Sequence, residues 1–254
     1  MSSKFEQLFD ELSRTNDRSI IWNNWLDYCI NINLMQTKSL YAPKDFYGNE
    51  ETYFEMFNEW INTLNKELNE KSYHDLLGYL YEDNVQSKGK AKDFQQYYTP
   101  QNVTEVMSEL VMHKKAEEYN GGWANDPCCG SGRFLLASHF KSKGGLYCLG
   151  QDLDETSCKM TVLNFYSHGV RGSVLHMNTL SGDFYKGWRV NKWLLHGIPV
   201  PHIEEISSIN EAFNFFGVNK NNFSSNNNAE VKIDDSITEE PKTTKPITGQ
   251  TTLF

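Results

Sequence analysis

The chain has 254 residues, enough for one large domain or two small ones of roughly 100–200 residues each. It carries 33 acidic and 24 basic side chains and a net charge of −9, so any contact with nucleic acid needs a local basic patch. No run of about 18 apolar residues occurs, and the five cysteines form no CxxC pair. We therefore expect a cytoplasmic protein with no membrane span, no disulfide framework and no bound metal.

Residues 1–93 are expected to form a small helical domain followed by a polar connector. Thr15, Asn16 or Asp17 suits the cap of the first of three helical stretches. Their apolar positions recur at helical spacing: Ile21, Trp25, Tyr28 or Cys29, and Ile32; Tyr53, Phe57, Trp60, Ile61, Leu64 and Leu68; Tyr73, Leu76, Leu77 and Leu80. Aromatic stripes of this kind are more often core surfaces than platforms for stacking bases. The sequence indicates no function for this domain.

Residues 94–217 alternate between helix and strand signals. Thr99 and Pro100 suit the start of a helix, which Gly121 and Gly122 would stop. Five apolar residues of this helix predict a buried stripe: Val103, Val106, Met107, Leu110 and Val111. Further elements are expected in chain order: a strand ending near 126, a helix after a Gly-rich turn, a strand over 146–150, a helix over 155–168 and a strand over 173–177. This order predicts a doubly wound α/β fold with a parallel sheet.

Residues 218–254 have a different composition. The segment 219–228 holds six asparagines, and 229–250 is charged, rich in threonine and interrupted by proline. Such a segment buries too little apolar surface to offset the entropy of ordering, so we expect a disordered tail.

The strongest local signal for chemistry is the segment from Asn125 to Phe134, NDPCCGSGRF. Glycines at a strand-to-helix turn let a ligand approach the backbone and the free N–H groups of the helix. Asp152 follows the next expected strand, 20 residues after Gly132, where a carboxylate can bond both ribose hydroxyls of a nucleoside cofactor. The turn and the acid together predict nucleoside binding. The alternative is two ordinary turns with solvated aspartates.

Four segments in order, FQQYYTPQNVTEVMSEL, NDPCCGSGRFLLAS, LGQDLDETSCKMTVLNFYSHG and HMNTLSGDFY, resemble the adenine-specific (N6) DNA methyltransferases related to the modification subunit of type I restriction systems. The resemblance covers residues 94 to about 188. It implies a Rossmann-like methyltransferase sheet, truncated here and preceded by the helical domain. It also implies S-adenosylmethionine as cofactor and DNA as partner, and a phage or mobile-element setting fits so compact a relative.

The resemblance assigns cofactor contacts to particular residues. The Tyr-Thr-Pro segment would contact the methionine end, the Gly-rich segment would wrap the methionine and ribose, and Asp152 would bind the ribose hydroxyls. Asn178 stands where the family usually has an aspartate that reads the adenine amino group, and its side-chain oxygen can accept the same bond. The residues so assigned are Tyr98, Thr99, Pro100, Asp126, Pro127, Cys128, Gly130, Gly132, Asp152 and Asn178.

The family's catalytic motif, an Asn or Asp followed by two prolines and an aromatic, is missing, because no two prolines are adjacent in the chain. Methylating an adenine amine needs acceptors for its hydrogens and an aromatic ring against the flipped base. Asn191, Trp193 and His202 are candidates for an improvised site. The alternative is a turn before a helix beginning near Ile203.

We expect a sheet of about four strands, shorter than in the family, whose edge needs a cover. The N-terminal helices, a second copy of the chain or a partner subunit would supply it. Lys186, Arg189 and Lys192, interleaved with aromatics, form the best nucleic-acid patch, and a surface loop with anchoring aromatics is the alternative. Cys128 and Cys129 are interpreted as packing residues rather than reactive thiols.

The last five residues, QTTLF, resemble the short motif by which bacterial replication and repair proteins dock on the sliding clamp. Leu253 and Phe254 would fill an apolar pocket, and the Gln250 amide would bond at its rim. A place at the end of a disordered tether favours such docking. An ordinary apolar terminus is the alternative.

Two functions remain open from the sequence. One is an S-adenosylmethionine-dependent adenine DNA methyltransferase that uses an unusual catalytic segment or that of a partner. The other is a noncatalytic methyltransferase-like module that docks on DNA or on the sliding clamp. The missing proline pair favours the second for this polypeptide alone.

Overall fold

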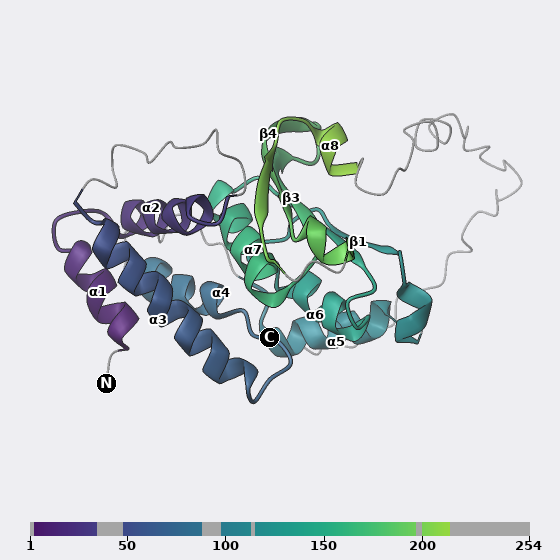
Figure 1. Cartoon of the computed structure of the whole chain (residues 1–254), viewed down its shortest axis with the longest axis horizontal. Helices are drawn as coiled ribbons and strands as arrows, with labels where there is room; N and C mark the ends of the chain where they lie inside the picture. The colour runs from purple at the N-terminus through teal and green to yellow at the C-terminus, as the bar shows by residue number, and fades with distance from the viewer. Residues whose placement is uncertain (1–2, 35–47, 88–97, 113–114, 197–199, 214–254) are drawn as a thin grey trace, which may run out of the picture. The chain divides into compact units, whose positions relative to one another are not determined.

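The computed structural model describes residues 3–34, 48–87, 98–112, 115–196 and 200–213 (Figure 1). The described residues all belong to one compact unit, Met1–Gly217, which we call the first unit. The expected disorder of the tail and the clamp-like motif lie outside the described residues. Within the described ranges no helix is long and apolar enough to cross a membrane.

A five-stranded sheet forms the centre of the first unit. Its strands are β1 (Trp123–Asp126), β2 (Tyr147–Asp152), β3 (Gly172–Asn178), β4 (Asp183–Val190) and β5 (Ile203–Ile206). They lie side by side in chain order; β1, β2 and β3 are parallel, and β4 and β5 are antiparallel to their neighbours. The α/β class and the three parallel strands are confirmed.

Three details of the expected sheet are wrong. The described sheet has five strands and not four, because β4 returns from β3 as a hairpin and β5 pairs with it. The segment at Ile203 is therefore a strand and not a helix. The sheet is also not doubly wound, since its strand order never reverses and both crossover helices pack on one face, where a Cβ at Gly150 would meet Leu135 and Thr161.

The two crossover helices are α6 (Arg133–Lys141) and α7 (Glu155–His168). The side chain of Asp154 caps α7 by accepting hydrogen bonds from the N–H groups of Thr156 and Ser157, and Gly169 ends it with φ +67°. The opposite face of the sheet carries α8 (Ile209–Phe213) over a small cluster: Leu149, Leu175, Met177, Ile206 and Ala212.

The N-terminal helices are α1 (Lys4–Leu12), α2 (Arg18–Asn31), α3 (Glu50–Leu68) and α4 (Leu76–Tyr81), which continues into a π-helical turn, Glu82–Gln86. Asp17 caps α2, and it is one of the three residues expected for this cap. Trp22, Trp25 and Trp60 are buried among these helices. They belong to one continuous core with α6, α7 and the adjacent face of the sheet.

Helix α5 (Gln101–Val111) corrects the sequence prediction. Its apolar stripe (Val103, Val106, Met107, Leu110 and Val111) is exposed and not buried, with Leu110 at 75%. The helix instead buries its small polar face, Thr104 and Ser108, and packs alongside α6 (Figure 1). Helical spacing identifies an apolar face but does not say what covers it. The helix ends at Val111, well before Gly121 and Gly122.

The first strand forms one edge of the sheet. Among the described residues β1 pairs with β2 on one side and with no strand on the other. Trp123 at its start is 36% exposed. An edge of this kind presents unpaired backbone groups to another strand.

Candidate functional site

The Gly-rich turn joins the end of β1 to the start of α6. Gly130 and Gly132 both have positive φ, +53° and +83°. A Cβ at Gly130 would lie 3.0 Å from the ring of Tyr98, and one at Gly132 would lie 2.9 Å from the side chain of Thr161. Glycine is therefore needed at both positions, for backbone conformation and for close approach.

The acidic residues that end β1 and β2 both accept hydrogen bonds from backbone N–H groups of this region. Asp126 Oδ1 accepts a hydrogen bond from the N–H of Cys128 at 3.1 Å. Asp152 Oδ2 accepts one from the N–H of Gly130 at 2.9 Å, and its Oδ1 accepts one from the N–H of Asp154 at 2.9 Å. Partial burial raises the pKa of both carboxyls above the usual range of aspartate, and for Asp126 the nearby Asp152 raises it further.

Tyr98 connects the turn to α7. Its hydroxyl lies 3.0 Å from Ser157 Oγ, which in turn donates to the capping carboxylate of Asp154 at 2.9 Å. Its ring packs edge-on against Tyr81 at 6.0 Å. Burial raises the pKa of Tyr98 far above its usual value, so the hydroxyl stays protonated and acts in hydrogen bonding.

A cavity of about 370 Å³ lies between the Tyr98 segment, α5 and the Gly-rich turn. Its size is in the range of small-molecule sites, roughly 300–1,000 Å³. Six of the predicted cofactor residues line it: Tyr98, Thr99, Asp126, Pro127, Cys128 and Gly130. Pro100, Gly132, Asp152 and Asn178 do not, although Asp152 binds the turn directly.

Asn178 is the last residue of β3, and its side-chain oxygen already accepts two hydrogen bonds. Asn178 Oδ1 accepts hydrogen bonds from the N–H groups of Leu180 at 3.0 Å and Ser181 at 3.3 Å. Thr179 Oγ1 lies 3.4 Å from the Pro127 carbonyl, which brings this loop next to the Gly-rich turn. These two bonds occupy both lone pairs of the oxygen, so it can accept from an adenine amino group only if the loop rearranges.

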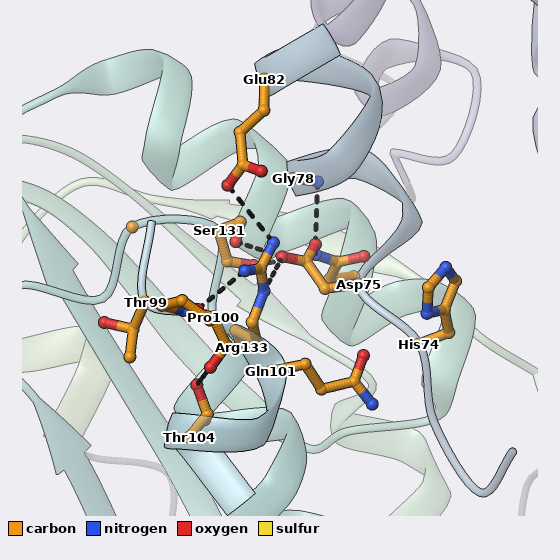
Figure 2. A network of polar contacts seen from close by, with 12 residues as sticks. His74, Asp75, Gly78, Glu82, Thr99, Pro100, Gln101, Thr104, Ser131 and Arg133 are labelled. Atoms are coloured by element: carbon orange, nitrogen blue, oxygen red, sulfur yellow. Dashed lines mark hydrogen bonds and ion pairs between the residues drawn. The ribbon is translucent and has the colours of Figure 1, made fainter. Parts of the chain in front are cut away.

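A buried network behind the turn was not predicted from the sequence (Figure 2). Arg133, the first residue of α6, donates from Nε to Asp75 Oδ2 at 2.8 Å and from Nη1 to the Thr99 carbonyl at 2.7 Å. Both side chains are buried, although Arg133 still contributes to the cavity wall. The signal available in the sequence was a cation in the first turn of a helix, where the macrodipole disfavours positive charge.

The three candidates for an improvised catalytic site lie elsewhere. Asn191 follows Val190, which pairs with Gly172 at the start of β3, whereas Asp126 and Asp152 lie at the ends of β1 and β2. Trp193 and His202 lie beside Asn191, their rings 6.0 Å apart. The structure therefore brings these residues together at the end of the sheet opposite the cavity.

The three cations of the predicted nucleic-acid patch have acidic or aromatic neighbours. Lys186 lies 3.3 Å from Glu205, and Arg189 lies 3.4 Å from Glu204. Lys192 lies over the ring of Trp193 at 4.9 Å. Strand β5 thus offsets two of the three charges, which weakens the patch as a phosphate-binding surface.

The two cysteines of the turn differ in environment. Cys128 is exposed and lines the cavity, whereas Cys129 is buried, with its sulfur 3.6 Å from Thr161 Oγ1. Burial raises the pKa of Cys129 well above the usual range, so its thiol is protonated. No group of three or more potential metal ligands occurs in the part of the chain that the structure describes.

Parallel strands joined by helices, a Gly-rich turn after the first strand and a carboxylate after the second define an α/β class that binds nucleoside cofactors at the carboxyl ends of its strands. Within that class, the model of the N-6 DNA Methylase family matches residues 72–198, half of the 254-residue chain. The chain belongs to the N6 adenine DNA methylase family. This family implies use of S-adenosylmethionine and binding to DNA. No curated protein and no solved structure matches the chain.

Proposed function

We propose that this chain binds S-adenosylmethionine in the cavity beside the Gly-rich turn. One observation carries the proposal: three segments meet at Gly130, where the Tyr98 ring packs on it and Asp152 accepts its N–H. Thr99 and Asp126 would hold the methionine end, whose cationic sulfonium and ammonium groups suit a carboxylate. Asp152 would bind the ribose hydroxyls, since a carboxylate has about four acceptor positions.

The proposal assigns no methyl transfer to this polypeptide by itself. The proline pair of the family motif is missing from the sequence, and Asn191, Trp193 and His202 lie away from the cavity. When bound, S-adenosylmethionine supplies an electrophilic methyl group. The described residues then hold and orient the cofactor, and acceptors for an adenine amine would come from another polypeptide or segment.

The second candidate function is an enzyme assembled from two polypeptides, and a specific observation favours it. The open edge of β1 and the apolar stripe of α5 contribute neighbouring walls of the same cavity, through Asn125 and Met107. A polypeptide that covered both would close the cavity and bury the stripe. A second copy of this chain is the first occupant to test.

We also propose, on the sequence motif alone, that the C-terminal residues dock on a bacterial sliding clamp. Docking there would place the cofactor-binding unit at replicating DNA in the cytoplasm. This part of the proposal is independent of cofactor binding and is tested separately.

The first experiment is calorimetry of the full chain with S-adenosylmethionine, followed by transfer of labelled methyl groups to unmethylated DNA. We expect saturable binding at one site and no transfer. Absence of binding would overturn the cofactor proposal. Transfer by the purified chain would show that it is an enzyme by itself, and the order of the reaction in protein concentration would then distinguish a monomer from a dimer.

A further inference from the structure

Asp75 is a buried carboxylate that joins four parts of the first unit. It caps α4 and is fully buried. Four donors surround it: Gly78 N at 2.9 Å and Asn164 Nδ2 at 2.7 Å on Oδ1, and Ser131 Oγ at 2.5 Å and Arg133 Nε at 2.8 Å on Oδ2. Figure 2 shows the carboxylate between α4 and the start of α6. Every acceptor position of the carboxylate is therefore occupied.

Two of these donors belong to the wall of the cavity. Ser131 lies in the Gly-rich turn and Arg133 follows it directly. Arg133 Nη1 also donates to the carbonyl of Thr99, which lines the same cavity from the segment before α5, at 2.7 Å. Its guanidinium stacks over the ring of Tyr79 at 4.6 Å and lies 3.6 Å from Glu82, both from the N-terminal region.

We propose that Asp75 is a positioning residue through which the N-terminal helices set the shape of the cofactor cavity. It holds Ser131 directly and Thr99 through Arg133, so it fixes the Gly-rich turn and the Thr99 segment, which both line the cavity, relative to each other. The inference rests on the proposed function only for the identity of the ligand. It also gives the N-terminal helices a role that the sequence did not indicate.

The surroundings of Asp75 leave little room for a different side chain there. A Cβ at Gly78 would lie 2.2 Å from Asp75 Oδ2 and 2.7 Å from Arg133 Nη2, so α4 approaches the ion pair as closely as a glycine allows. An amide in place of the carboxylate would turn an NH₂ group toward a neighbouring donor and leave the Arg133 charge without its buried partner. We therefore expect Asp75→Asn to release the turn.

The test compares Asp75→Asn with a matched control, Asp27→Asn. Asp27 on α2 pairs with the buried Lys159 of α7 at 2.9 Å, so the control also removes a carboxylate that links the N-terminal helices to α7, but it has no contact with the turn. Amide hydrogen exchange over residues 128–134 is measured without any added ligand. Calorimetry with S-adenosylmethionine is then performed well below the unfolding temperature of each variant.

We expect Asp75→Asn to speed exchange in the turn at least tenfold and to weaken S-adenosylmethionine binding at least tenfold. Asp27→Asn should lower the unfolding temperature. Its exchange rate in the turn and its affinity for S-adenosylmethionine should stay within about twofold of the wild-type values. If Asp75→Asn does not fold, Asp75→Ser replaces it, since a serine at this N-cap position can still accept from the N–H of Gly78. A change of the same sign is expected there. Asn164→Ala is unsuitable, because Asn164 Nδ2 also donates to the carbonyl of Ser131 in the turn at 2.8 Å.

Unchanged exchange in the turn of the folded variant would overturn the inference, as would equal changes in the control. If the unchanged protein does not bind S-adenosylmethionine, the proposed function fails, but the exchange measurement still decides whether Asp75 positions the turn. Faster exchange together with unchanged affinity would overturn the claim that this positioning matters for the cofactor.

Discussion

Asp152 accepts a hydrogen bond from the N–H of Gly130 at 2.9 Å, so the carboxylate at the end of β2 is bonded to the turn that follows β1. The bond places an acceptor at the carboxyl ends of two neighbouring parallel strands. The same carboxylate would accept hydrogen bonds from a bound ribose and would also hold the backbone of the turn in place.

The first prediction follows from this double role. Asp152→Ala should weaken S-adenosylmethionine binding by about 1–3 kcal/mol, and Asp126→Ala should act similarly at the methionine end, because each removes a charged acceptor. Calorimetry measures both. Asp183→Ala, at an exposed position at the start of β4, is the control. Unchanged affinity in both cavity variants would mean that the Gly-rich turn is only structural.

A second prediction concerns the apolar stripe of α5. Because Val106 and Leu110 are 59% and 75% exposed, replacing both with lysine should change the free energy of unfolding by no more than about 1 kcal/mol. Had the stripe been buried, as its spacing suggests, the cost would be several kcal/mol. Urea unfolding measures the difference. Light scattering on the same variant tests self-association, and an oligomer that the lysines dissociate would identify the stripe as a contact between copies.

The third prediction is a pH dependence of stability that His139 causes. Burial, with Arg171 and His168 nearby, lowers the pKa of His139 to about 4. Below its ordinary pKa of about 6.5, the unfolded chain takes up a proton there that the folded protein does not, so stability is present above that pH and is lost toward pH 4. His139→Gln should therefore reduce the stability difference between about pH 7.5 and about pH 5 by about 2 kcal/mol.

Urea unfolding of both proteins at the two pH values gives this difference. His176→Gln, at a partly exposed position on β3, is the matched control for the substitution of histidine by glutamine. A parallel loss of stability in wild type and His139→Gln on acidification would rule out His139 as its source.

Asn191 gives a fourth prediction. It is fully buried with φ +59°, and its Nδ2 donates to the carbonyls of Phe165 and Val170 at 2.8 and 3.0 Å. Asn191→Ala should cost about 2–4 kcal/mol of stability and leave cofactor affinity unchanged. Asn191→Gly tolerates the positive φ and should cost less. A loss of affinity at full stability would contradict this prediction and show that Asn191 influences the cavity.

The fifth prediction tests the C-terminal motif. The intact chain should bind a purified bacterial sliding clamp, and Leu253→Ala/Phe254→Ala should abolish that binding by removing the two apolar anchors. Calorimetry with the clamp measures the affinity of both forms. Glu239→Ala, in the same tail but outside the motif, is the control and should bind normally. Equal binding by both forms, or none by either, would discard the docking proposal.

Local signals in the sequence were enough to predict the parallel half of the sheet. Helix α7 has a capping Asp154 and a terminating Gly169, and its bounds agree with the prediction. The Gly-rich turn and Asp152 could be predicted because both depend on positions close to strand ends. Strand β5 was missed because the segment from Ile203 was expected to begin a helix, and only its pairing with β4 decides between helix and strand.

Two other features could not be predicted for a different reason. The Asp75–Arg133 pair joins residues 58 positions apart, and no periodic pattern relates them. The exposure of the α5 stripe depends on which element lies beside it, which spacing does not encode. In both cases the missing information is a long-range contact.

The order of the strands has a consequence for synthesis of the protein on the ribosome. Each strand pairs with its neighbour in the chain, so the sheet can be completed strand by strand as the chain emerges. The N-terminal helices emerge before the sheet. Asp27 of α2 can pair with Lys159 only after a further 132 residues have been synthesised. Until then, the face of α2 that packs on α7 has nothing to cover it. We expect this interval to be when the nascent protein is most prone to aggregate or to need a chaperone.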